Sequence, residues 1–336
     1  MTFITHPPNT KIDLQPIGNT PAHVHLLEEN AIHAINAALG AGRPLLVRGE
    51  PGTGKSQLAR AAAKALGRAF IPFVVDARTE SRDLLWHFDA VERLAQAQLQ
   101  GALCTDRDQI REQMHVKRFI APGPLWWAFN WDEASDQAIH LKHTPPPQPD
   151  GGSHRNGCVV LIDEIDKAES DVPNGLLEAL GVSSFQPQGL DAPVTVQGTA
   201  PLLLITTNEE RTLPDAFLRR CFVLPLDPPD VVRERETFLD HLIRRGAAHF
   251  PQMEGLQIVV EKEKRLFLQV AAELVAEDRV NAIDQRLNPL PGVAEYLDLL
   301  RSVIAQAQGD EAQMNQLLHQ VRAFAVRKHN LSKESV

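Results

Sequence analysis

The sequence predicts an α/β fold in which a parallel sheet is covered by helices on both faces. Short, continuously apolar stretches recur between residues 44 and 226 and alternate with helical patterns, as is typical of strands buried on both faces of a parallel sheet. A glycine-rich segment separates the first apolar stretch from an alanine-rich helix, which is the setting of a phosphate-binding loop. The 336 residues suffice for one large domain or two of ordinary size.

Five of these apolar stretches are expected to be the strands of the sheet. They are PLLVRG (44–49), AFIPFVVDA (69–77), CVVLIDE (158–164), PLLLITTN (201–208) and CFVLPL (221–226). Apolar residues at helical spacing predict a helix over 24–42, ending at Gly40 and Gly42, and the alanine-rich helix over 55–67 is closed by Gly67.

The pattern divides the chain into three segments. Residues 1–20 have weak periodicity and are expected to form an arm, and a domain boundary is expected near residue 228, where PLDPPD precedes a wholly helical pattern. An αβα domain over 21–228 would then be followed by a helical domain over 229–336. An insert of about 80–157 lies between the second and third strands, and it holds all four tryptophans, Trp86, Trp126, Trp127 and Trp131. We expect these rings to pack on the core rather than to form an exposed interface.

Within the insert, HTPPPQPDGGSHRNG (143–157) is rich in proline and glycine and is expected to be a mobile loop.

Composition excludes several classes of protein. The net charge of −9 argues against a general nucleic-acid binder, because such proteins normally carry a basic excess. The sequence has no apolar run of membrane-spanning length and no signal-peptide pattern at its start. Three widely spaced cysteines, Cys104, Cys158 and Cys221, fit a reducing compartment and neither a disulfide framework nor a zinc site. A cytoplasmic protein is therefore expected.

GEPGTGKS (49–56) matches the phosphate-binding pattern G-x-x-x-x-G-K-[ST] at every fixed position. Its glycines let backbone N–H groups turn toward phosphate oxygens, and the following helix adds positive charge at its N-terminus. Lys55 would reach the β- and γ-phosphates, and the Ser56 hydroxyl would bind Mg²⁺. The expected nucleotide-binding residues are Gly49, Glu50, Pro51, Gly52, Thr53, Gly54, Lys55, Ser56 and Gln57.

Polar residues end two of the predicted strands. VVLIDEID (159–166) carries paired carboxylates, of which Asp163 could hold the Mg²⁺ shell and Glu164 could polarise the attacking water. Asn208 ends LLLITTN, and its carboxamide could orient that water or touch the γ-phosphate. This arrangement favours hydrolysis over phosphoryl transfer to a small molecule.

With these motifs the chain resembles the AAA+ ATPases, and among them the MoxR-like group. The resemblance extends from about Pro21 to Ala305 and rests on GEPGTGKS, VVLIDEIDKA, TTN and LPDAFLRRCF, together with FIAPGPLWWAF (119–129) and LLEALGVSSFQPQG (176–189). It implies a P-loop AAA+ αβα domain with a five-stranded parallel sheet of order 5-1-4-3-2, followed by a small all-helical lid. It also implies ATP and Mg²⁺ as ligands, and ATP hydrolysis.

The same resemblance gives a role to the arginine pair in LPDAFLRRCF. AAA+ proteins form rings, usually hexamers, in which an arginine before the fifth strand reaches the nucleotide held by the neighbouring subunit. Matching this pattern places that arginine finger at Arg220 in preference to Arg219, and the other arginine would contact the neighbour or its nucleotide. An arginine suits this task because it stays charged and offers a planar fork of donors. The alternative is that the pair is only surface charge.

One feature departs from the resemblance. Many AAA+ proteins carry a lid arginine, called sensor 2, at the start of a late helix, whereas this chain has Gly292, Val293 or Ala294 at the expected place. Arg286 lies too early in the sequence, so sensor 2 is either displaced or absent.

Three functions remain open at this level. The first is a homo-oligomeric, ATP-driven remodeller of a protein partner; MoxR-like proteins are often paired with von Willebrand factor A domain proteins, and this chain has no D-x-S-x-S motif of its own. The second is a nucleotide-gated structural or regulatory subunit with little turnover. The third is a nucleic-acid-stimulated motor, against which the net charge of −9 counts.

Overall fold

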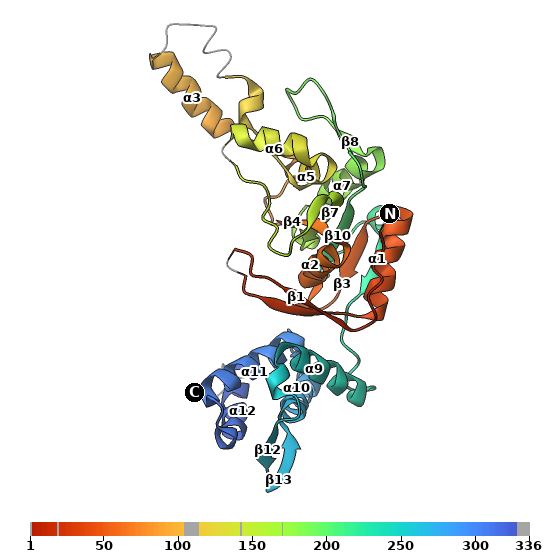
Figure 1. Cartoon of the computed structure of the whole chain (residues 1–336), viewed down its shortest axis with the longest axis vertical. Coiled ribbons are helices and arrows are strands. Elements are labelled where there is room, and N and C mark those ends of the chain that lie inside the picture. The colour runs from red at the N-terminus through yellow and green to blue at the C-terminus, as the bar shows by residue number, and fades with distance from the viewer. Residues whose placement is uncertain (1, 19, 104–113, 142, 170, 328–336) are drawn as a thin grey trace. The chain divides into compact units, whose positions relative to one another are not determined.

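The computed structural model describes residues 2–18, 20–103, 114–141, 143–169 and 171–327 (Figure 1). They form two compact units. The first comprises Met1–Arg48 and Lys55–Pro225, and the second comprises Gly49–Gly54 and Leu226–Val336.

A five-stranded parallel sheet forms the centre of the first unit. Its spatial order is β11-β3-β10-β7-β4, and every pair of neighbours is parallel. Numbered along the chain, these strands have the order 5-1-4-3-2, so the predicted fold class is confirmed. The strands are β3 (Leu45–Arg48), β4 (Arg68–Val74), β7 (Ser153–Asp163), β10 (Leu202–Thr207) and β11 (Phe222–Pro225).

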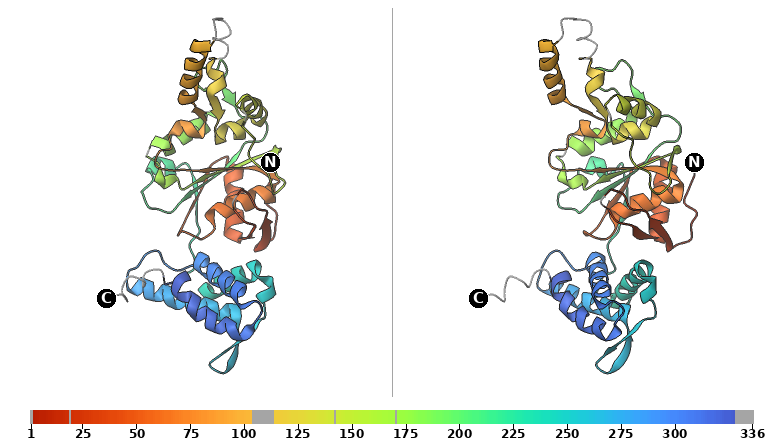
Figure 2. Two further views of the ribbon diagram at one scale, coloured as in Figure 1. Left: turned by 90° about the vertical axis from the view of Figure 1, so that its left-hand side faces the viewer. Right: turned by 60° about the vertical axis from the view of Figure 1, so that its left-hand side comes forward.

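Helices lie on both faces of this sheet, as Figure 2 shows. Helix α1 (Glu29–Ala41) packs on β3 and β11, and α2 (Lys55–Leu66) packs on β4, β7 and β10 through small alanine side chains. On another part of the sheet, Val160 and Ile162 of β7 join a core with residues of α5 (Pro124–Phe129) and α7 (Asp171–Val182). All six residues of β10 are buried, which explains why its sequence is almost continuously apolar.

The N-terminal segment differs from the prediction of an arm followed by a helix from residue 24. Strand β1 (Thr10–Leu14) pairs antiparallel with β2 (His23–Leu27), and α1 begins only at Glu29. Ile12 and Leu14 are buried while Lys11 and Asp13 are exposed. This alternation of period two is the mark of a half-buried strand, and it is too short to stand out in a polar, proline-containing segment.

The insert consists of several elements. They are η1 (Ser81–Leu84), β5 (Trp86–Phe88), α3 (Ala90–Leu103), η2 (Val116–Phe119), β6 (Ile120–Pro122), α5 and α6 (Trp131–His140). Some pack against the core of the sheet, whereas Val91, Leu94 and Leu99 of α3 are exposed. Trp126 and Trp127 are 1% and 6% exposed, and Trp86 and Trp131 pack against the same core. The expected packing of the tryptophans on the core is therefore confirmed. Cys158 and Cys221 are buried free thiols, whereas Cys104 lies outside the described residues.

The proline- and glycine-rich loop, expected to be mobile, is held by specific hydrogen bonds. Gln148 accepts from the Phe70 N–H at 2.7 Å and donates to the Phe70 carbonyl at 2.8 Å, as a neighbouring strand would at the edge of the sheet. Asp150 accepts from Arg60 of α2 at 2.7 and 3.0 Å and from the Gln15 N–H at 2.8 Å. The loop thus joins the edge strand, α2 and the N-terminal hairpin.

The second unit is helical, with one small hairpin that the all-helical expectation missed. Its helices are α9 (Arg235–His249), α10 (Phe267–Asp284), α11 (Val293–Ala307) and α12 (Glu311–Ala325), and its strands are β12 (Gln257–Val260) and β13 (Glu263–Leu266). Phe238, Phe267 and Tyr296 are fully buried in its core, where the Tyr296 hydroxyl donates to the Leu268 carbonyl at 3.0 Å. No helix among the described residues is long and apolar enough to cross a membrane.

Removing the carboxylate of Asp150 should destabilise the first unit. The Arg60 side chain is only 4% exposed, so Asp150→Ala leaves a buried guanidinium without its counter-charge, and we expect a loss of about 3 kcal/mol in the free energy of unfolding. Urea denaturation followed by tryptophan fluorescence measures this. Asp136→Ala on the exposed face of α6 is the control and should change stability by about 0.5 kcal/mol or less. Equal effects of the two changes would contradict the prediction.

Candidate functional site

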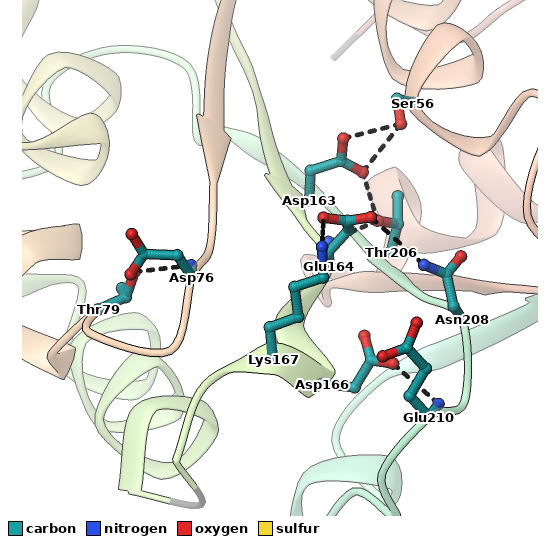
Figure 3. Close-up of polar contacts among 10 residues, drawn as sticks. All are labelled: Ser56, Asp76, Thr79, Asp163, Glu164, Asp166, Lys167, Thr206, Asn208 and Glu210. Atoms are coloured by element: carbon teal, nitrogen blue, oxygen red, sulfur yellow. Dashed lines mark hydrogen bonds and ion pairs between the residues drawn. The ribbon is translucent and has the colours of Figure 1, made fainter.

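The carboxyl ends of the central strands bring Asp163, Glu164 and Asn208 together (Figure 3). Ile205 of β10 is level with Ile162 of β7, and Thr206 is level with Val47 of β3. Asp163 and Glu164 follow Ile162 directly, and Asn208 follows the end of β10. In-register parallel strands therefore deliver these side chains to one edge of the sheet, the usual ligand-binding edge of such folds (Figure 3).

The two predicted Mg²⁺ ligands are in direct contact. The Ser56 Oγ lies 2.9 Å from Oδ1 and 2.8 Å from Oδ2 of Asp163, and its hydroxyl donates to this carboxylate. Ser56 stands in the first turn of α2, beside Lys55, which is 6% exposed. Among the described residues no three His, Cys, Asp or Glu side chains form a metal cluster. One hydroxyl and one carboxylate suit Mg²⁺ bound mainly through nucleotide phosphates and water.

Thr206 is a member of this site that the sequence analysis missed. Its hydroxyl donates to Asp163 Oδ1 and accepts from the Glu164 N–H at 2.9 Å. The residue is fully buried in β10, so water cannot replace either hydrogen bond. The available signal was a polar residue in an otherwise apolar strand, but a role was predicted only for Asn208, which follows that strand.

The predicted general base, Glu164, is held in an unusual conformation. Its backbone is left-handed, with φ of 60° and ψ of 48°, which costs a non-glycine residue of order 1 kcal/mol or more. Its Oε2 accepts from Lys167 Nζ at 2.5 Å, and its Oε1 lies 3.4 Å from Asn208 Nδ2. The hydrogen bond that Lys167 donates to Glu164 raises the pKa of Lys167 above its ordinary value. Glu164 thus lies between Asn208 and Lys167, and the contact with Lys167 was not predicted from the sequence.

A second bridge joins the segments that carry Glu164 and Asn208. Asp166 in η3 (Ile165–Lys167) is 3% exposed, and its Oδ2 accepts from the Glu210 N–H at 3.0 Å. The hydroxyl of Thr207 accepts from the Glu209 N–H at 2.9 Å. These contacts fix the chain on both sides of Asn208.

Arg219 and Arg220 follow the one-turn helix α8 (Asp215–Leu218) and precede β11, and both are exposed. The predicted finger residues therefore stand at the surface, as a residue that acts on a neighbouring subunit must.

The loop Gly49–Gly54 belongs by its contacts to the second unit. Gly52 and Gly54 have φ of 79° and 94°, which glycine adopts without strain. The Thr53 hydroxyl donates to the Glu50 carbonyl at 2.9 Å. Pro51 also lies in this loop, whereas Gln57 is the third residue of α2, the helix that follows the loop.

Within the second unit a lid arginine does contact this loop, from a place the sequence analysis did not consider. Arg279 of α10, 6% exposed, donates from Nη2 to Glu50 Oε1 at 2.6 Å and from Nη1 to Oε2 at 2.9 Å. Arg279 Nη1 also donates to the Pro291 carbonyl at 2.9 Å, so this guanidinium lies at the start of α11, whereas Gly292, Val293 and Ala294, where sensor 2 was sought, carry no charge themselves.

Comparison with known proteins identifies the family. The model of the AAA domain (dynein-related subfamily) matches residues 44–221, more than half of the chain. The chain belongs to this family. Its members are in general nucleotide-binding ATPases.

Two relatives are mitochondrial Lon protease homologs. That of Phaeodactylum tricornutum is 28% identical over 254 residues, 73% of this chain and 23% of the relative. That of Yarrowia lipolytica is 26% identical over 223 residues, 64% of this chain and 15% of the relative. The chain spans less than a quarter of the length of either relative.

Two solved structures are also similar. A mutant of Thermotoga maritima RuvB aligns with 88% of this chain and 68% of its own length, at a TM-score of 0.46 and 16% identity. A putative ATPase from Cytophaga hutchinsonii aligns with 87% of this chain and 78% of its own length, at a TM-score of 0.35 and 14% identity.

Thr206→Val should lower ATP hydrolysis about tenfold or more, because it removes the hydroxyl that orients Asp163 and Glu164 while preserving side-chain volume. Thr206→Ser keeps the hydroxyl and should retain most of the turnover. Thr195→Val, at a half-buried threonine of β9 (Val194–Thr195) outside this contact network, is the control and should keep turnover within about threefold. Turnover of Thr206→Val equal to that of wild type would contradict the positioning role.

Proposed function

We propose that the chain is a MoxR-like AAA+ ATPase that binds and hydrolyses MgATP at the interfaces of a homo-oligomeric ring. The observation that carries the proposal is the contact network of Ser56, Asp163, Thr206, Glu164 and Asn208 at the carboxyl ends of adjacent strands. It combines a metal-binding pair, a candidate base and a polar group that can orient water.

The chemistry assigns a role to each group. The backbone N–H groups of the loop and Lys55 would hold the phosphates, and Ser56 with Asp163 would hold Mg²⁺, which would neutralise charge on the phosphates. Glu164 accepts a proton from the attacking water as Asn208 orients that water. Lys167 donates to Glu164 Oε2, so Oε1, which lies beside Asn208 Nδ2, is the oxygen placed to accept the proton of the water.

The second half of each site comes from a neighbouring subunit in this proposal. Arg220, or else Arg219, reaches the γ-phosphate bound by the next subunit and stabilises charge in the transition state; such fingers contribute roughly 10³–10⁵ in rate in other NTPases. A hexamer is the expected ring. Exposure of both side chains supports this arrangement.

The work done by the ring is proposed from the MoxR-like motifs. Hydrolysis would drive chaperone-like remodelling or activation of a protein partner, and a separate von Willebrand factor A domain protein suits the role of partner. A nucleotide-gated subunit with little turnover is the second candidate, favoured by the uncharged residues Gly292, Val293 and Ala294 where the sensor 2 arginine was expected. Sustained turnover that depends on Arg220 would exclude this second candidate.

Particle mass and ATPase rate across a protein dilution series test the shared site. We expect the specific activity to fall as the oligomer dissociates, because a monomer cannot supply its own finger. Constant specific activity down to the monomer would contradict the ring.

Mixing two inactive variants tests the same point independently. Lys55→Ala subunits lose their own site but keep Arg220, whereas Arg220→Ala subunits keep the site and lose the finger. Either variant alone should lack turnover, and their mixture should regain a substantial part of it. A mixture as inactive as its components, or an Arg220→Ala variant as active as wild type, would overturn the trans site.

A further inference from the structure

The main-chain turn that carries the arginine pair is bound by a third arginine, Arg43. The Arg43 Nε donates to the Arg220 carbonyl at 3.0 Å, and its Nη2 donates to the Arg219 carbonyl. One guanidinium thus spans both residues of the pair through their backbone, leaving the two side chains free of this contact.

The position of Arg43 is itself fixed by the fold. It follows Gly42, whose left-handed φ of 60° ends α1, and its own N–H donates to the Ala38 carbonyl at 3.1 Å. The Arg43 guanidinium lies over the Phe222 ring at 5.8 Å, and the Phe222 N–H donates to the Pro44 carbonyl at 2.9 Å. The residue is therefore anchored by α1 on one side and by the pairing of β3 with β11 on the other.

The chemistry of this contact calls for an arginine. A planar fork can donate to two successive carbonyls while its face stacks on an aromatic ring, which a lysine ammonium cannot do. The acceptors are neutral carbonyls rather than carboxylates, so the contact orients the turn without neutralising the positive charge of Arg43. That charge adds to the attraction for an anionic phosphate.

We propose that Arg43 is a positioning residue for the arginine finger, holding the turn Arg219–Arg220 in the orientation that reaches the nucleotide of the neighbouring subunit. The inference rests on the proposed function. Arg43 also stands two residues before β3, the strand that leads into the phosphate-binding loop. The same segment therefore supports both the subunit's own site and the finger that it offers to the neighbouring subunit.

Arg43→Met tests the proposal, because it keeps an unbranched side chain over Phe222 and removes every donor. MgATP affinity should stay within about threefold of wild type, and turnover should fall about tenfold or more, since the finger stays present but loses its support. Arg43→Lys should be impaired nearly as much. Arg155→Met, at an exposed position of β7, is the control and should match wild type in both quantities.

The mixing experiment separates positioning from general damage. Arg43→Met subunits should regain turnover when mixed with Lys55→Ala subunits, whose arginine turn is intact, and should regain none when mixed with Arg220→Ala subunits. Particle mass in each mixture confirms that rings have formed. A defect in the subunit's own site would give the opposite pattern. Arg43→Met subunits would regain nothing beside Lys55→Ala subunits but would restore turnover beside Arg220→Ala subunits, because they would still supply an intact finger.

Two results would overturn this inference without touching the trans site. The first is turnover of Arg43→Met equal to that of wild type. The second is a mixture with Lys55→Ala subunits that restores the turnover of Arg220→Ala but not that of Arg43→Met. Failure of Lys55→Ala subunits to restore Arg220→Ala as well would overturn the trans site itself, and this inference with it.

Discussion

The candidate site depends on the register between strands β7 and β10. Because Leu202 to Ile205 lie level with Val159 to Ile162, the residue after each aligned segment, Thr206 or Asp163, reaches the same edge of the sheet. A shift of one residue would turn Thr206 to the other face and separate it from Asp163. All of β10 and the aligned part of β7, from Val159 to Ile162, are buried, so the packing of apolar side chains holds this register and determines where the polar groups meet.

Around this register lies a layer of hydrogen bonds that constrains the functional side chains. Thr206 holds Asp163 and the Glu164 backbone, and Asp166 holds the segment after Asn208. Buried hydrogen bonds of this kind keep a left-handed backbone at Glu164 that would otherwise relax. The site is therefore preorganised by residues that need not touch the substrate, and Arg43 plays the corresponding part for the arginine turn.

Sequence patterns predicted the five strands, and the family resemblance supplied their order, because apolar runs and the phosphate-binding motif are local features. The contacts of Thr206, Arg43 and Arg279 could not be predicted in this way. They join residues separated by 42 to 43, 176 to 177 and 229 positions respectively, so only the folded chain brings their partners together. The N-terminal hairpin was missed for a different reason, since five-residue strands leave too short an alternation to recognise.

The most direct test of the account is to measure MgATP affinity and hydrolysis of Glu164→Gln beside wild type. If Glu164 is the base, the neutral, nearly isosteric glutamine should bind MgATP within a few-fold of wild type and lose about a hundredfold or more in turnover. Turnover close to that of wild type, with the nucleotide bound, would contradict the assignment on which the proposed mechanism rests.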